Sequence, residues 1–131
     1  MYKSILAFSL FTLALAATIT SCGKDDEDNT VDYASQANCA SFPAAATTYS
    51  PTIKAVLDTY CASAGCHDAI TASEGVDLSD YAKAKNAFEK KEVLCTIHHG
   101  SGCTPMPQGG DQLDATTINL IDCWVKNGYP Q

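Results

Sequence analysis

The sequence predicts a small all-α domain of three main short helices, preceded by an export signal and a disordered tether. Apolar residues recur at helical spacing in three segments, and helix-capping residues stand before each of them. No segment has the alternation or the apolar clustering that predicts a strand. About 110 residues follow the export signal, which is enough for one small domain.

The first helix is expected from about residue 51 to residue 61. Ser50 offers an N-cap, and Pro51 suits the first helical position because its missing N–H has no partner there. Apolar side chains then repeat at i, i+3, i+4 and i+7, at Ile53, Val56, Leu57 and Tyr60.

The other two helices are expected within 80–93 and 115–127. Ser79 can cap the helix within 80–93. Asp114 can cap the helix within 115–127, and Gly128 ends it. The apolar stripes comprise Tyr81, Ala84 and Phe88 in the former, and Ile118, Ile121 and Val125 in the latter.

Residues 1–21 have the pattern of a secretory signal peptide: one Lys, a short apolar run, then small residues. The signal ends in Ile-Thr-Ser before Cys22, which resembles the lipobox of bacterial lipoproteins. The resemblance implies cleavage before Cys22 and acylation of its sulfur. An ordinary signal peptide followed by a chance Cys is the alternative.

Residues 22–47 are interpreted as a lipidated N-terminus, an acidic tether and an irregular arm, and residues 48–131 as the folded domain. The run GKDDEDN after the lipobox resembles the acidic export signal of Bacteroidetes-type lipoproteins. It implies an exported protein anchored to the cell envelope by lipid, in the outer membrane and with its domain on the surface. A solvated acidic tether is the simpler interpretation.

The charge balance disfavours nucleic acid as a partner. The chain has 8 Lys, no Arg and 15 acidic residues, whereas phosphate binding relies on clustered Lys and Arg. A basic protein partner suits this balance better, because opposite charges steer association.

The stretch YCASAGCH contains the residue types of a covalent haem site. A c-type haem needs two thiols for its vinyl groups and a His beside the second Cys for its iron, usually spelled C-x-x-C-H. Here Cys61, Cys66 and His67 form C-x₄-C-H, with a small spacer in which Gly65 can take backbone angles that other residues resist.

A second iron ligand is expected downstream, on the opposite face of the haem. Met106 stands between two prolines in a polar, Gly-rich loop, where a core role is not expected. His and Met together are the ligands of electron-transfer cytochromes c. His98 and His99 precede Met106 closely; they are either polar loop residues or competitors for the same ligand position.

From about residue 49 to residue 131, the chain resembles the mono-haem cytochrome c-like domains of Bacteroidetes lipoproteins. The resemblance implies one covalent haem c, with thioethers at Cys61 and Cys66, His67 as proximal ligand and Met106 as distal ligand. The chain departs from the family pattern in its four-residue spacer and in the extra Cys pair of CTIHHGSGC. The matching pieces are Val56-Leu57…Cys61…Gly65-Cys66-His67, Gly75 to Lys85, Met106 to Gly110, and Ile118 to Gly128.

Four cysteines remain for disulfides once lipid and haem have taken three of the seven. Cys95 and Cys103 bracket a short Gly-containing loop and suit a local bridge. Cys39 and Cys123 would then tie the two ends of the domain together. Other pairings, such as Cys39 with Cys95, remain open.

Electron transfer to an unidentified redox partner is the favoured function, without enzymatic activity or a small-molecule substrate. One alternative is a haem-free surface binding module stapled by three disulfides. A lesser version of it is a zinc site using Cys61, Cys66 and either His98 or His99. Another alternative is a haem enzyme or sensor, such as a peroxidase-like module. An Arg is expected near an activated peroxide, and the chain has no Arg.

Overall fold

A computed structural model describes residues 31–131, and these residues form an all-α unit without strands. The expected fold class is confirmed, with four α-helices in place of three. The predicted signal, Cys22 and the acidic part of the tether lie outside the described residues. The helices are α1 (Lys54–Tyr60), α2 (Tyr81–Lys90), α3 (Val93–Ile97) and α4 (Ala115–Lys126).

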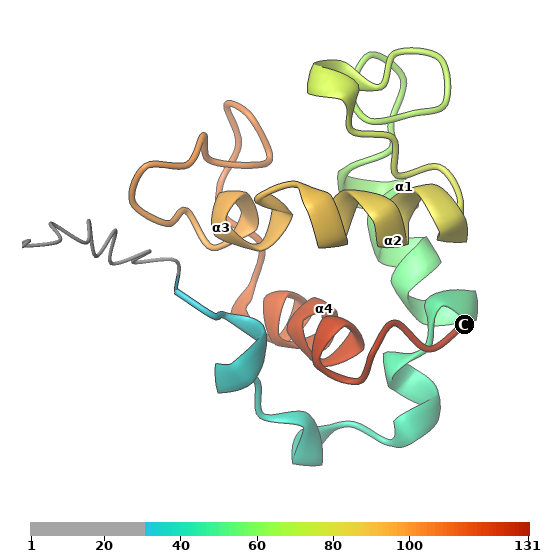
Figure 1. The fold of residues 1–131 in the computed structure, drawn as a ribbon, viewed down its shortest axis with the longest axis vertical. Coiled ribbons are helices and arrows are strands. Elements are labelled where there is room, and N and C mark those ends of the chain that lie inside the picture. The colour runs from blue at the N-terminus through green and yellow to red at the C-terminus, as the bar shows by residue number, and fades with distance from the viewer. Residues whose placement is uncertain (1–30) are drawn as a thin grey trace, which may run out of the picture.

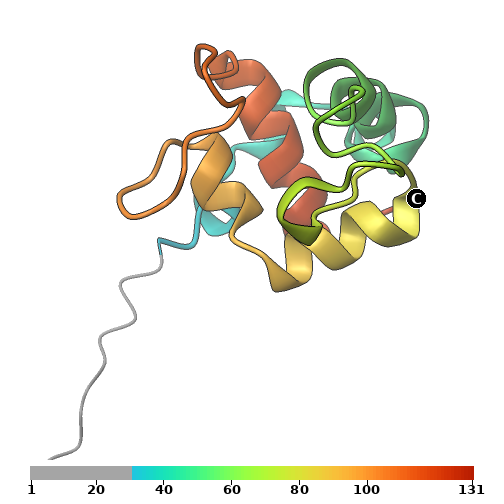
Figure 2. The same ribbon diagram turned by 90° about the horizontal axis from the view of Figure 1, so that it is seen from above.

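Helix α4 lies at the centre of the fold (Figure 1). The N-terminal arm packs against it, and α2 and α3 cross it on another side. Two long loops, 61–80 and 98–113, project from the same side of α2 and α3. Seen from above, they stand at opposite ends of these helices (Figure 2).

The sequence prediction for α4 is confirmed in detail. The Asp114 carboxylate accepts hydrogen bonds from the amides of Thr116 and Thr117, so it caps the helix. Gly128 follows the helix with φ +78°, where a side chain would be strained. Ile121 and Trp124 are fully buried, so α4 supplies the middle of the core.

The predicted start of the second helix is corrected by one residue. Asp80, not Ser79, caps α2, because its carboxylate accepts the amide of Lys83. The Ser79 hydroxyl instead donates to Asp77, at 2.6 Å.

The segment expected as one helix from 80 to 93 is broken after Lys90. Lys91 is extended, which ends α2 and redirects the chain. Helix α3 then buries Val93 and Ile97 in the same core as Phe88.

The predicted cap of the first helix was also wrong. Ser50 is extended, and its side chain caps nothing. A π-type turn (Tyr49–Ile53) precedes α1, and the Tyr49 amide donates to the carbonyl of Pro130 at 2.8 Å. The start of α1 is therefore held by the C-terminal end of the chain.

The described part of the arm is irregular but packed. It forms 3₁₀ turns at Ala34–Gln36, Cys39–Ser41 and Ala44–Thr47. The Lys126 ammonium donates to the carbonyls of Ser35 and Ala37, at 3.1 and 2.9 Å. The packed unit thus includes residues N-terminal to the expected boundary at 48.

Both expected disulfides are present: Cys39–Cys123 joins the arm to α4, and Cys95–Cys103 closes the loop after α3. Among residues 31–131, no helix has the length and apolar character needed to cross a membrane.

We expect the Cys39→Ala/Cys123→Ala pair to lower the free energy of unfolding by about 4 to 5 kcal/mol. The Cys95→Ala/Cys103→Ala pair should cost about 2 to 3 kcal/mol, because the loop that it closes in the unfolded chain is far shorter. Urea denaturation of the two variants measures both losses. Equal losses would contradict the loop-entropy explanation.

Candidate functional site

A cavity of about 830 Å³ lies between the two projecting loops. All four residues predicted to hold a haem line it: Cys61, Cys66, His67 and Met106. Residues on both loops and on all four helices contribute to its wall. Its volume falls within the range of about 300 to 1,000 Å³ that is usual for cofactor sites.

The inner wall of this cavity is apolar. A large apolar group bound there would pack against these side chains and so stabilise the fold. Three charged residues, Glu74, Lys91 and Glu92, also border the cavity. The buried apolar residues of the wall are Leu57, Leu78, Phe88, Val93, Ile97 and Ile121.

The four-residue spacer folds back on itself and brings both thiols to one cavity. The Cys61 amide still donates to Leu57 at the end of α1, and the Cys66 amide donates to the Ser63 carbonyl at 3.0 Å. Gly65 has φ +88°, a backbone angle that other residues resist, as expected for a Gly in this spacer.

Asp68 stabilises the turn after this motif. Its carboxylate accepts the amides of Ile70, Thr71 and Gly65, at 2.8, 3.1 and 2.9 Å. These hydrogen bonds, with that of Ile70 the largest cause, lower the pKa of Asp68 to about 2.

Cys61 and Cys66 are free thiols in the structure, the former half-buried and the latter exposed. Burial, with the Cys66 charge as a smaller cause, raises the pKa of Cys61 to about 11. The Cys61 thiol is therefore protonated at neutral pH, which does not suit a catalytic nucleophile.

His67 is held in one orientation and one tautomer. Its Nδ1 lies 3.1 Å from the carbonyl oxygen of Val76. A carbonyl can only accept, so Nδ1 carries the hydrogen, and in the neutral ring Nε2 keeps a lone pair. An imidazole with an Nδ1–H···O=C bond is prepared to bind a metal through Nε2.

Met106 lines the cavity from the other loop, and hydrogen bonds hold its backbone on both sides. Its amide donates to the Thr96 carbonyl at the end of α3, at 3.0 Å. Its carbonyl accepts from Nε2 of His99, at 3.0 Å. Thr96 and His99, the partners in these two hydrogen bonds, both lie within the loop that the Cys95–Cys103 disulfide closes.

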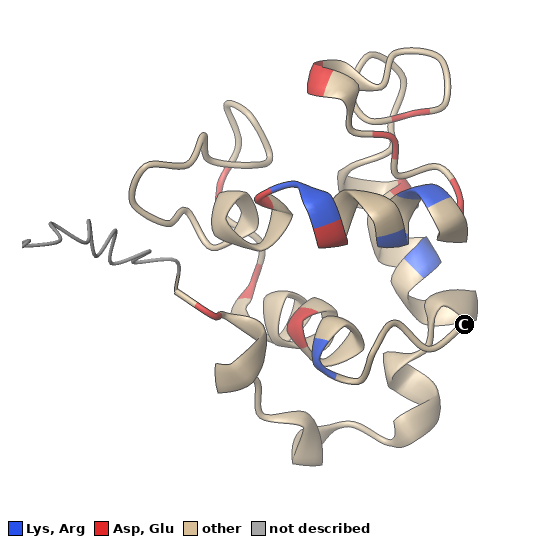
Figure 3. Cartoon of the chain, viewed as in Figure 1, with Lys and Arg blue, Asp and Glu red and all other residues tan. Residues whose placement is uncertain are grey.

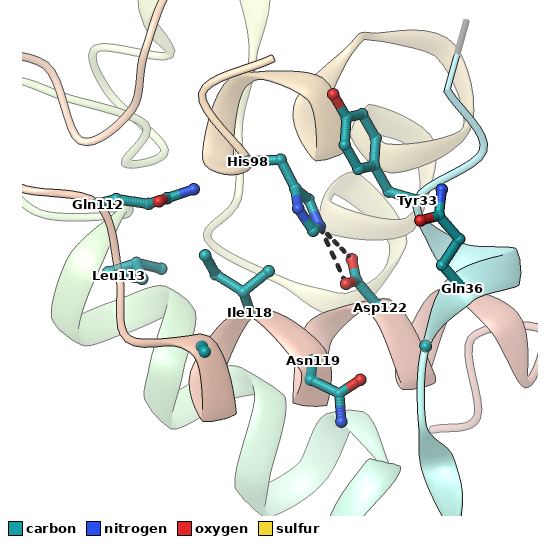
Figure 4. A pocket seen from close by; sticks show the side chains of 10 residues that line it. Tyr33, Gln36, His98, Gln112, Leu113, Ile118, Asn119 and Asp122 are labelled. Carbon is teal, nitrogen blue, oxygen red and sulfur yellow. Dashed lines mark hydrogen bonds and ion pairs between the residues drawn. The ribbon is translucent and has the colours of Figure 1, made fainter.

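His98 lies at a second cavity of about 430 Å³ (Figure 4). Its Nε2 donates to both carboxylate oxygens of the buried Asp122, at 3.0 and 2.9 Å, and its ring stacks on Tyr33. Burial raises the pKa of Asp122, although the hydrogen bond from His98 opposes this shift. His98 thus connects α4 with the arm.

Neither His98 nor His99 lines the larger cavity. Nor does the described part of the chain bring three His, Cys, Asp or Glu side chains together as a metal site. The set required by the zinc alternative is therefore not assembled among these residues.

Charge is unevenly distributed along the chain (Figure 3). The loop of residues 61–80 contains four acidic residues and no Lys or Arg, whereas α2 carries lysines. Lys83 pairs with Asp77 and Asp80, at 3.0 and 3.4 Å. The loop that carries Cys66 and His67 is therefore the acidic side of the site.

Three contributions to this site were missed in the sequence. Asp68 could have been found, because an Asp that caps amides two and three residues ahead is a recognisable local pattern. The contacts of His67 with Val76 and of His99 with Met106 depend on how the loops fold, so spacing gave no signal of them.

No protein-family model matches the chain, and no curated protein or solved structure is significantly similar to it. The resemblance to cytochrome c-like domains therefore rests on the quoted motifs.

We expect Asp68→Ala to destabilise the domain at neutral pH and to lose this effect in acid. The folded state lowers the Asp68 pKa from 3.8 to about 2, so its stabilisation is present above 3.8 and disappears as the pH falls through 2. Urea denaturation between pH 6 and pH 2 measures the difference from wild type.

The exposed Asp111 supplies the matched control, Asp111→Ala. A gap between wild type and Asp68→Ala that stays constant across this pH range would contradict the assigned role of Asp68.

Proposed function

We propose that this domain is a mono-haem c-type cytochrome that transfers electrons. The observation that carries the proposal is the convergence of Cys61, Cys66, His67 and Met106, from two separate loops, on one cavity with an apolar inner wall. Haem c bound there would supply an iron that alternates between its ferric and ferrous states.

The cysteines support covalent attachment. Four of the six cysteines among residues 31–131 are paired, and the two free ones are those of the C-x₄-C-H motif. Free thiols are unusual in an exported protein, because oxidising compartments favour disulfides. Thioether bonds to a porphyrin would account for both.

His67 and Met106 are suited to the two axial positions. The hydrogen bond to Val76 leaves Nε2 of His67 free for iron, and the paired hydrogen bonds hold Met106. A thioether opposite a His raises the reduction potential and leaves no open position for a substrate. The proposal is therefore an electron carrier and not an enzyme.

The proposed setting is the bacterial cell envelope, where lipid on Cys22 would anchor the domain to the outer membrane. Two acyl chains are sufficient for stable anchoring. The acidic loop around Cys66 favours a redox partner with a basic surface, because opposite charges raise the association rate.

Haem staining after a denaturing gel tests attachment in a host with cytochrome c maturation factors. We expect the wild type to stain and Cys61→Ser/Cys66→Ser to lose the stain completely. Cys95→Ser/Cys103→Ser is the matched control and should keep it. A colourless wild type contradicts the proposal.

Met106→Ala tests the distal ligand in the same preparation. We expect the variant to keep its covalent haem, to have a lower reduction potential, and to bind carbon monoxide rapidly when reduced. An unchanged spectrum and potential would move the ligand position to another residue, with His99 the nearest candidate along the chain.

A haem-free, disulfide-stapled binding module is the second candidate. The two disulfides and the cavity beside Tyr33 and His98 favour it. It predicts a third disulfide, between Cys61 and Cys66. Thiol titration of the exported, haem-free protein would then find no free cysteine.

A further inference from the structure

We propose that His99 is the positioning residue for Met106. The inference rests on the proposed function, because it concerns how the chain presents its distal ligand. His99 does not line the cavity, so it acts on the backbone that carries the Met106 side chain.

The contact is specific in its atoms. The Met106 carbonyl oxygen lies 3.0 Å from Nε2 of His99. A carbonyl only accepts, so Nε2 carries the hydrogen, and Nε2 is the donor in any protonation state that keeps this bond. With the Met106 amide donating to Thr96 at 3.0 Å, both peptide groups of Met106 are held.

The backbone of His99 shows what this contact requires. Its φ is +52°, in the left-handed region, where a side chain crowds the following carbonyl oxygen. Gly or Asn would take this conformation with less strain. Neither has a donor with the reach of imidazole, so the hydrogen bond is what a His supplies at this position.

The surrounding loop keeps the contact in place. The amides of His99 and Gly100 donate to Thr96 and Cys95, at 3.2 and 2.9 Å. Cys95–Cys103 joins the two sides of the turn. A Cβ at Gly100 would come within 2.8 Å of the Cys95 sulfur, so the chain passes close to this bridge.

The adjacent His98 makes different contacts. Nε2 of His98 donates to Asp122, towards α4 and the second cavity (Figure 4). The two neighbouring histidines thus give a matched pair: one holds the distal loop, and the other holds the arm and α4.

The test uses three substitutions of His99 in the full chain. His99→Gly relieves the backbone and removes the donor, and His99→Asn tolerates the backbone but is too short. His99→Gln keeps an N–H donor of nearly the same reach. Competition between Met106 and added imidazole for the iron, followed by absorption, reports how firmly Met106 is held.

We expect the affinity for imidazole to rise about 2- to 10-fold in the Gly and Asn variants, the effect of losing one hydrogen bond. The Gln variant should return to within about 2-fold of wild type. His98→Asn should lower the melting temperature and leave the affinity within 2-fold.

Wild-type affinity in the Gly and Asn variants would overturn the proposal. So would a Gln variant that behaves like Gly, or a His98→Asn variant with the same rise in affinity.

Amide exchange at Met106, measured in the haem-free chain, separates this proposal from the proposed function. We expect His99→Gly to speed exchange about 2- to 10-fold, since the peptide groups around Met106 lose a restraint. Unchanged exchange overturns the positioning role whether or not haem binds. A wild type that never binds haem overturns the proposed function, and with it the ligand role of Met106.

Discussion

An apolar cavity within a small domain is the constraint on which this structure depends. Residues such as Leu57, Phe88 and Ile121 are packed on one side and face the cavity of about 830 Å³ on the other. Atoms that line a void have no packing partner on that side and lose the dispersion attraction that such a partner would supply. A domain this small has little core to spare, so a large apolar ligand or covalent cross-links must compensate.

No disulfide cysteine belongs to the buried apolar wall of this cavity, although Cys103 is among the residues that line the cavity. Cys39–Cys123 fastens the arm to α4, whose Trp124 and Ile121 are fully buried. Cys95–Cys103 restrains the loop between α3 and Met106. The scaffold can thus hold two loops apart, with the C-x₄-C-H motif on one and Met106 on the other. This arrangement is what supports haem binding over a simple stapled module.

Local patterns predicted the parts of the fold that local physics decides. The cap, stripe and stop signal of α4 all act within a few residues, and the prediction was confirmed from Asp114 to Gly128. The predicted start of α1 was wrong because the Tyr49 amide donates a hydrogen bond to the carbonyl of Pro130, at the other end of the domain. The break between α2 and α3 was missed because burial of Val93 decides it, and propensity does not.

The candidate site also has parts that the sequence predicted and parts that it did not. The residue types and order of the motif predicted which side chains share a cavity, although spacing carried no information on the support of each. His98 and His99 were indistinguishable in sequence, yet one bonds to Asp122 and the other to Met106. Their partners come from separate elements, so only the folded chain separates a stabilising His from a positioning one.

Peptide mapping tests the central claim most directly. Trypsin should release residues 55–83, which contain Cys61, Cys66 and His67, as one peptide. Mass spectrometry of protein from a host with haem maturation factors should find this peptide carrying one haem, with neither thiol open to alkylation. A haem-free peptide with a Cys61–Cys66 disulfide, or with two alkylated thiols, would contradict the account.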